Sequence, residues 1–137
     1  MIYFNNYNSA KDITEDTTTS ENFNSTTADQ NAVSVSGKIN VTIKDSKISK
    51  TGDSSGGDTT SFYGINSALI AKDGANLTLE NINVETSATG ANGVFCYGGS
   101  ATTNNSYSDG TTITIKNSTI KTEKDASGGI MTTGGGI

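Results

Sequence analysis

The sequence contains no proline, tryptophan or histidine, and its nine basic residues are all lysine. The net charge is −5 and the lysines form no basic patch, so the chain has little attraction for phosphate backbones. We therefore do not expect nucleic acid as a partner. The single cysteine, Cys96, cannot form an internal disulfide and leaves the redox compartment undecided.

The first residues, MIYFNNYNSAKD, have neither the basic leader nor the apolar run of a signal peptide. No segment is long and apolar enough to suggest a membrane span. We expect either a protein that is not secreted or a mature or recombinant fragment.

Threonine, serine, asparagine and glycine dominate the sequence, and only 31% of the residues are hydrophobic. Such a composition can indicate disorder, but here the apolar residues fall in strictly periodic clusters. A chain of 137 residues forms one domain at most. The sequence therefore predicts a single folded domain.

One ten-residue segment occurs three times, as VTIKDSKISK from Val41, LTLENINVET from Leu77 and ITIKNSTIKT from Ile113. Its alternating apolar and polar residues predict strands. A second element aligns across the chain as AVSVSG, ALIAKDG, GVFCYGG and GIMTTGG, with unequal spacings. Together the spacings reduce to a unit of 25 residues, with eleven residues inserted near 52–62 and again near 100–109.

A 25-residue unit of three short strands separated by turns predicts an all-β fold, a right-handed parallel β-helix of about three coils. A short β-sandwich is the alternative. In the β-helix, equivalent residues stack in columns about 4.8 Å apart. The interior columns are expected to be Val41/Leu77/Ile113, Ile43/Leu79/Ile115, Ile48/Val84/Ile120 and Val33/Leu69/Val94/Ile130.

Other columns are expected at the corners and on the outer surface. Asp45, Asn81 and Asn117 form a corner column of residue types that tolerate a left-handed backbone. Lys44, Glu80 and Lys116 alternate in charge on the outside, and Glu85 should face Lys121.

The chain divides into residues 1–31, which should form an irregular or partial N-terminal coil that shields the first rung, and residues 32–137, the β-helix. A further first strand would begin at position 138, so we expect unpaired strand edges at the C-terminal end. Either more coils follow in a longer protein, or two chains meet end to end.

The segments DGTTITIKNSTIKT, ASGGIMTTGGG, FYGINSALIAKDG and GANGVFCYGG resemble the Thr- and Gly-rich β-helix proteins of gut clostridia and methanogenic archaea, which are described as adhesin-like. The resemblance runs from about Asn31 to the end of the chain. It implies a pectate-lyase-like fold, an extracellular or cell-surface location, and binding of a protein or glycan rather than catalysis.

Some β-helix proteins are polysaccharide lyases or glycosidases, so a carbohydrate-active protein is the alternative function. Such enzymes need an Arg or Lys base beside carboxylates, or two carboxylates at a defined separation. The acids of this chain occur singly, and we expect no catalysis. Asp53 and Asp58 in GDSSGGDTT are weak candidates for calcium ligands, although a solvated loop explains them as well. No other cofactor is indicated.

The third strand of the unit carries the candidate binding site. If Leu69, Val94 and Ile130 point inward, alternation turns Ile70, Phe95 and Met131 outward, in a stripe flanked by Lys72 and Tyr97. An exposed apolar stripe is typical of an interface or a ligand platform. Alternatively, one of the insertions folds over the stripe with Phe62, Tyr63 or Tyr107. Cys96 falls in an inward column and is expected to be a buried, inert thiol.

Overall fold

The computed structural model describes residues 6–99 and 107–137, which form three parallel β-sheets and one short helix. Sheet A contains β1 (Ser9–Ile13), β4 (Asn31–Ser36), β7 (Leu69–Lys72), β10 (Val94–Tyr97) and β13 (Ile130–Thr133). Sheet B contains β2 (Thr17–Thr19), β5 (Asn40–Lys44), β8 (Asn76–Glu80) and β11 (Thr112–Lys116). Sheet C contains β3 (Phe23–Ser25), β6 (Lys47–Lys50), β9 (Asn83–Ser87) and β12 (Thr119–Glu123), and α1 spans Asp58–Tyr63.

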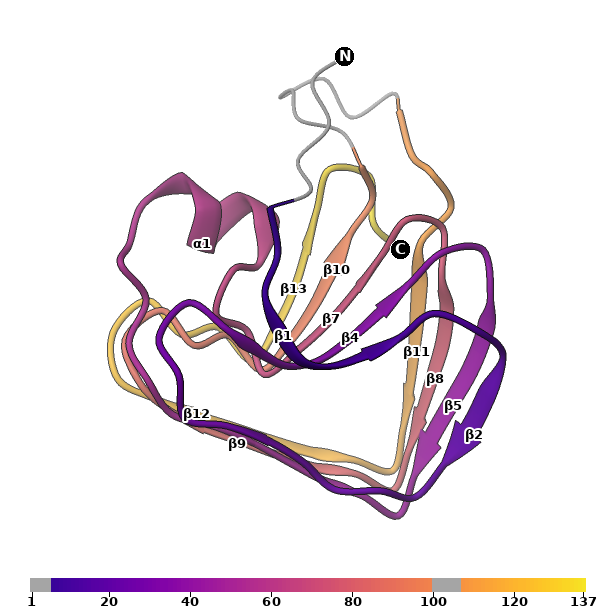
Figure 1. The fold of residues 1–137 in the computed structure, drawn as a ribbon, viewed down its shortest axis with the longest axis horizontal. Coiled ribbons are helices and arrows are strands. Elements are labelled where there is room, and N and C mark those ends of the chain that lie inside the picture. The colour runs from indigo at the N-terminus through magenta and orange to yellow at the C-terminus, as the bar shows by residue number, and fades with distance from the viewer. Residues whose placement is uncertain (1–5, 100–106) are drawn as a thin grey trace.

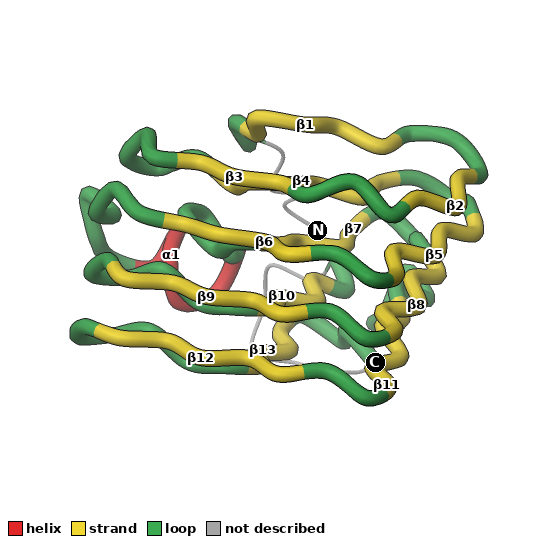
Figure 2. The backbone as a smooth tube through the Cα atoms, turned by 90° about the horizontal axis from the view of Figure 1, so that it is seen from below, coloured by secondary structure: helices red, strands yellow, loops and turns green. Residues whose placement is uncertain are grey.

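The chain passes through sheets A, B and C in the same order again and again, and each strand pairs with the strand three places further along. Figure 1 shows the three sheets on three sides of a common interior, with α1 outside sheet A. In Figure 2 the successive strands of each sheet lie one below another. We call β1–β3 the first rung and β11–β13 the last rung.

The strand register confirms the predicted columns. Val41 pairs with Leu77 and Leu77 with Ile113, and the columns through Ile43 and Ile48 continue in the same way. In β5 and β8 buried residues alternate with more exposed ones, as a period of two requires. Apolar side chains from all three sheets pack into one interior cluster, which is the main core.

The corner between sheets B and C is made by the predicted column. Asp45, Asn81 and Asn117 have φ angles of 51°, 51° and 48°. Asn81 Nδ2 also donates a hydrogen bond of 2.8 Å to Asp45 Oδ1, so the corner side chains bond along the column. Short polar side chains accept this left-handed backbone more readily than other residues do.

Within the predicted N-terminal segment, the described residues 6–31 form β1, β2 and β3, which pair in parallel with β4, β5 and β6 and so make a more regular coil than we expected. The first insertion contains α1. Most of the second insertion lies outside the described residues. Lys44, Glu80 and Lys116 align as predicted, and Glu85 aligns with Lys121.

The ion pairs on sheet C differ from the register partners. Glu85 Oε2 lies 3.4 Å from Lys47 Nζ, and Lys121 Nζ lies 3.3 Å from Glu123 Oε1. A lysine side chain is long enough to reach a diagonal neighbour, so register alone does not decide its partner. In the described part of the chain, no helix combines the length and the apolar character that crossing a membrane requires.

Candidate functional site

The outward stripe of sheet A is not an exposed surface, which corrects the sequence-based interpretation. Ile70 and Phe95 do point away from the main core, but both are 0% exposed. They form a second cluster with Tyr97, against which Tyr7, Tyr63 and Met131 pack. The first insertion therefore covers the stripe, as the alternative interpretation proposed.

The end of α1 fits closely against the stripe. Gly64, which ends the helix, has a φ of 74°, and a Cβ at this position would lie 2.7 Å from the ring of Phe95. Glycine is therefore required both by the backbone conformation and by the close approach. The Tyr63 ring meets the Tyr97 ring edge-on, with centroids 5.4 Å apart.

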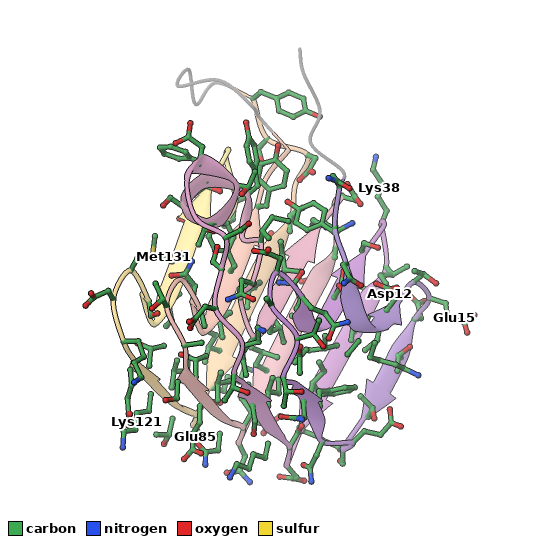
Figure 3. All side chains as sticks on the ribbon, turned by 60° about the vertical axis from the view of Figure 1, so that its left-hand side comes forward. Asp12, Glu15, Lys38, Glu85, Lys121 and Met131 are labelled. Atoms are coloured by element: carbon green, nitrogen blue, oxygen red, sulfur yellow. The ribbon has the colours of Figure 1, made fainter. Side chains whose placement is uncertain are left out.

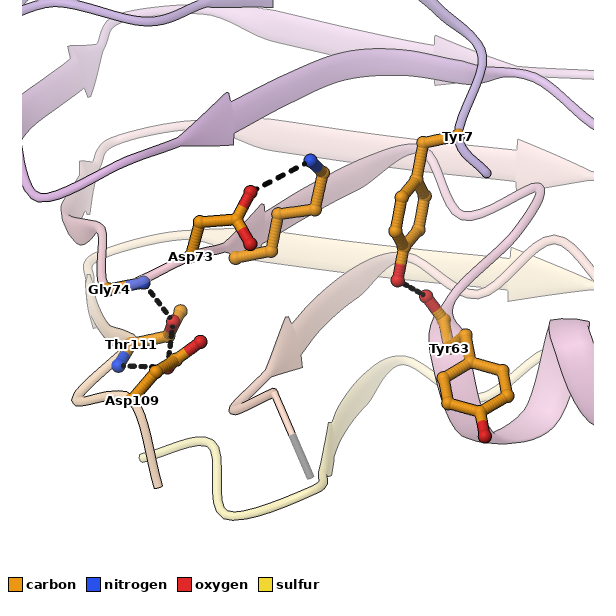
Figure 4. A network of polar contacts seen from close by, with 7 residues as sticks. Tyr7, Tyr63, Asp73, Gly74, Asp109 and Thr111 are labelled. Atoms are coloured by element: carbon orange, nitrogen blue, oxygen red, sulfur yellow. Dashed lines mark hydrogen bonds and ion pairs between the residues drawn. The ribbon is translucent and has the colours of Figure 1, made fainter. Parts of the chain in front are cut away.

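Lys72 and Tyr97, which were predicted to flank the stripe, also lie beneath or beside the segments that cover it. Tyr97 is fully buried, and Lys72 Nζ lies 4.8 Å from the centroid of the Tyr7 ring and 3.1 Å from Asp73 Oδ2 (Figure 4). Burial lowers the pKa of Lys72, and burial raises the pKa of Asp73, with a smaller contribution from Asp109. Tyr97 is therefore enclosed in the apolar cluster, and Lys72 is mostly covered at its edge, so the two residues do not form an open platform.

The two weak calcium candidates lie in different settings. Asp53 Oδ1 accepts a hydrogen bond of 2.9 Å from the backbone amide of Thr89, and Asp58 lies in the first turn of α1. Within residues 6–99 and 107–137, no three His, Cys, Asp or Glu side chains come together as a metal-binding group. The visible role of Asp53 is to join two successive turns.

Cys96 is buried, as the sequence predicted, with an exposure of 2%. Burial raises the pKa of its thiol to about 11. Sγ lies 3.4 Å from the carbonyl oxygen of Thr111, so the thiol is packed at the junction of sheets A and B. A protonated, enclosed thiol is a poor nucleophile.

Lys50 is a polar residue whose role the sequence did not reveal. Although it is a lysine, it is only 1% exposed. Its Nζ donates hydrogen bonds to the carbonyl oxygens of Thr27, Thr51 and Gly52, at 2.7, 2.5 and 3.3 Å. The ammonium group thus joins the turn of one rung to the turn of the next. Its alignment with Ser25 and Thr86, in an inward column, was the signal available in the sequence.

An open groove runs along the corner between sheets B and C, with a volume of about 550 Å³. All of its lining residues except Ile82 are polar or charged, although the stems of these side chains contribute apolar surface as well. We call it the sheet C groove, and its principal residues are Asp45, Lys47, Asn81, Asn83, Glu85, Asn117, Thr119 and Lys121. A smaller hollow of about 220 Å³ shares Glu85 and Lys121 with it, so the two depressions adjoin on the outer face of sheet C.

The register of sheet C positions these side chains. Lys47, Asn83 and Thr119 form one outward column, and Glu85 and Lys121 belong to the next. Figure 3 shows Glu85 and Lys121 projecting outward from neighbouring strands. The groove therefore presents amide, hydroxyl, carboxylate and ammonium groups at strand spacing along the direction in which the rungs stack.

The groove has the chemistry of a binding surface for hydroxyl-rich molecules. Asparagine amides both donate and accept hydrogen bonds, and lysine and glutamate add charged donors and acceptors. Lys47 and Glu85 form an ion pair in the groove, but both side chains are about half exposed, so their attraction is weak and leaves both groups accessible. We did not predict any residue of this groove as a binding residue from the sequence, because each one has the character of an ordinary exposed strand or corner residue.

Comparison of the chain with known protein families, with curated proteins and with solved structures finds no match in any of the three.

Proposed function

We propose that the three sheets form a right-handed parallel β-helix. Support comes from the repeated A–B–C order, from the parallel pairing of every strand three places along, and from an interior filled by stacked aliphatic columns. The right-handed sense follows from the strong preference of parallel crossover connections for that hand.

We propose that the protein is a non-catalytic, adhesin-like binding or scaffold protein that works outside the cell or at its surface. The observation that carries this proposal is the sheet C groove, an open surface lined mainly by polar and charged residues that stack on successive strands. A groove that follows the stacking direction suits an extended partner, and its amides and charges suit the hydroxyl groups of a glycan chain. The location is supported by the resemblance noted in the sequence.

A carbohydrate-active enzyme is the second candidate. One observation favours it, which is that the groove places Lys47 and Lys121 on either side of Glu85. A lysine base beside a carboxylate is a combination used in polysaccharide cleavage. Against this role, the Glu85 carboxylate is already engaged by Lys47 at 3.4 Å.

The proposal is tested by binding to a glycan array, followed by titration of the polysaccharide that binds best. The double variant Lys47→Ala/Lys121→Ala should weaken binding at least tenfold. The matched control is Lys44→Ala/Lys116→Ala, which removes two exposed lysines from the outer face of sheet B. Release of unsaturated or reducing sugar ends would overturn the non-catalytic assignment. An equal loss in both double variants would exclude the groove as the site.

A further inference from the structure

The lysines of the sheet C groove are already paired with carboxylates of the protein. Lys47 Nζ lies 3.4 Å from Glu85 Oε2, and both residues line the groove. Lys121 Nζ lies 3.3 Å from Oε1 of Glu123, which lines the adjoining hollow. We call these two contacts the outer ion pairs. The charges of the two depressions are therefore largely neutralised within the protein itself.

This charge arrangement disfavours an acidic ligand. A uronate or sulfate group that approached either lysine would also come close to the carboxylate paired with it, so attraction and repulsion would largely cancel. Asp45, which lines the groove at the corner, adds a further negative charge. The chain as a whole has a net charge of −5, so its long-range field also repels polyanions.

An exposed ion pair suits a hydroxyl group, because a hydroxyl both donates and accepts hydrogen bonds. In each outer ion pair an ammonium donor stands beside a carboxylate acceptor, and the side chains are about half exposed or more. One sugar hydroxyl can accept a hydrogen bond from the ammonium group and donate one to the carboxylate. Both bonds are strengthened by the charge of the protein group.

The uncharged residues of the groove also favour hydrogen bonding to hydroxyl groups. The lining includes amide and hydroxyl side chains on successive strands, namely Asn22, Asn83, Asn117 and Thr119. Among the described residues, neither depression has an aromatic side chain in its lining, so a sugar ring has no aromatic face to stack on. Recognition in the groove therefore relies on hydrogen bonds.

We propose that the ligand of the sheet C groove is an uncharged glycan whose hydroxyl groups bind at the outer ion pairs. This inference rests on the glycan-binding function proposed above and names the class of its ligand. The two depressions adjoin, because Glu85 and Lys121 line both of them. The strands that carry the pairs follow one another at a spacing of about 4.8 Å, so a short run of sugar units reaches both pairs.

An acidic glycan is the competing ligand, and Glu85 distinguishes the two. For an uncharged glycan the Glu85 carboxylate is a hydrogen-bond acceptor, so Glu85→Gln should weaken binding at least about threefold. For an acidic glycan the same carboxylate is a source of repulsion, so Glu85→Gln should strengthen binding. Glu80→Gln is the matched control, because Glu80 is an exposed carboxylate on the outer face of sheet B.

The first test is a glycan array that carries uncharged glycans together with glycans bearing uronate, sialate or sulfate groups. We expect the strongest binding to uncharged glycans. The glycan that binds best is then titrated by calorimetry against the wild-type chain, Glu85→Gln and Glu80→Gln. Between about 50 mM and about 500 mM NaCl the affinity of the wild type should change less than about threefold, because the ligand carries no charge for salt to screen.

Binding that is equal for both classes, or stronger for acidic glycans, would overturn this inference and leave the glycan-binding function intact. Absence of binding to any glycan would overturn both. Stronger binding by Glu85→Gln, or the same affinity in Glu85→Gln and Glu80→Gln, would exclude the outer ion pairs as hydroxyl-binding groups. Circular dichroism of each variant shows whether its fold is retained, so that a weaker affinity is not mistaken for lost structure.

Discussion

The hydroxyl of Tyr7 donates a hydrogen bond of 2.6 Å to the carbonyl oxygen of Tyr63 and thereby fastens the segment before β1 to the end of α1. Figure 4 shows the hydroxyl of Tyr7 meeting the backbone of Tyr63. Beneath them lie Ile70, Phe95 and Tyr97, each fully buried. Sheet A thus has a core on each face, and the outer core joins segments that are 56 residues apart in the sequence.

Phe95→Ala should lower the free energy of unfolding by about 3 to 5 kcal/mol, because it leaves a cavity beneath α1. Phe62→Ala, on the exposed side of the helix, should change it by less than about 1 kcal/mol. Urea denaturation of both variants makes the comparison. A small effect of Phe95→Ala would mean that the cover over sheet A is absent in solution.

Leu79→Asp should unfold the protein, because it places an unpaired carboxylate in an interior column where Leu79 is 0% exposed. Thr78→Asp changes the adjacent residue, which faces outward on sheet B, and should be mild. Thermal unfolding followed by circular dichroism distinguishes the two. Similar melting temperatures would contradict the assignment of inward and outward positions.

Lys50 should make the stability of the fold depend on pH. Burial lowers the pKa of its ammonium group to about 8, while Asp29 and Asp53 act in the opposite direction by favouring the charged form. Between about pH 8 and the ordinary lysine pKa, the unfolded chain binds more protons than the folded one, so this residue makes the free energy of unfolding rise with pH. Cys96 opposes that trend, because burial raises its pKa to about 11.

The contribution of Lys50 is isolated by comparing the chain with Lys50→Met at a series of pH values. The difference in the free energy of unfolding, wild type minus variant, should increase from pH 8 towards pH 10. At neutral pH the variant should be about 1 to 3 kcal/mol less stable, because three carbonyl oxygens lose their donor. A difference that stays constant with pH would show that Lys50 titrates normally.

Asn81→Val should lower the free energy of unfolding by at least about 1 kcal/mol, because a β-branched residue is strained at the φ of 51°. Asn81→Gly accepts this backbone conformation and loses only the hydrogen bond to Asp45, so it should be the milder change. Chemical denaturation of the two variants provides the measurement. A larger loss for glycine than for valine would show that the side-chain bond outweighs the backbone strain.

The strands and their interior columns could be predicted from the sequence alone. Alternation with a period of two determines which residues of a strand share a face, and the repeats at Val41, Leu77 and Ile113 show which strands are equivalent. The corner column also followed, because Asn and Asp are the residue types that tolerate its backbone. The first rung was not recognised as a set of strands, since Lys11, Thr17 and Thr19 replace the aliphatic residues that reveal the pattern elsewhere.

Which side chains are exposed at the surface could be learned only from the tertiary structure. Whether Phe95 is exposed depends on where α1 and Tyr7 pack. No local sequence pattern specifies a contact between segments that are so far apart in the chain. Lys50 is enclosed because two turns direct their carbonyl oxygens towards its ammonium group. The sheet C groove forms because corner and strand residues that are distant in the sequence stack beside one another. Local periodicity determines which way a side chain points from its strand, whereas its exposure is determined by what the rest of the chain packs against it.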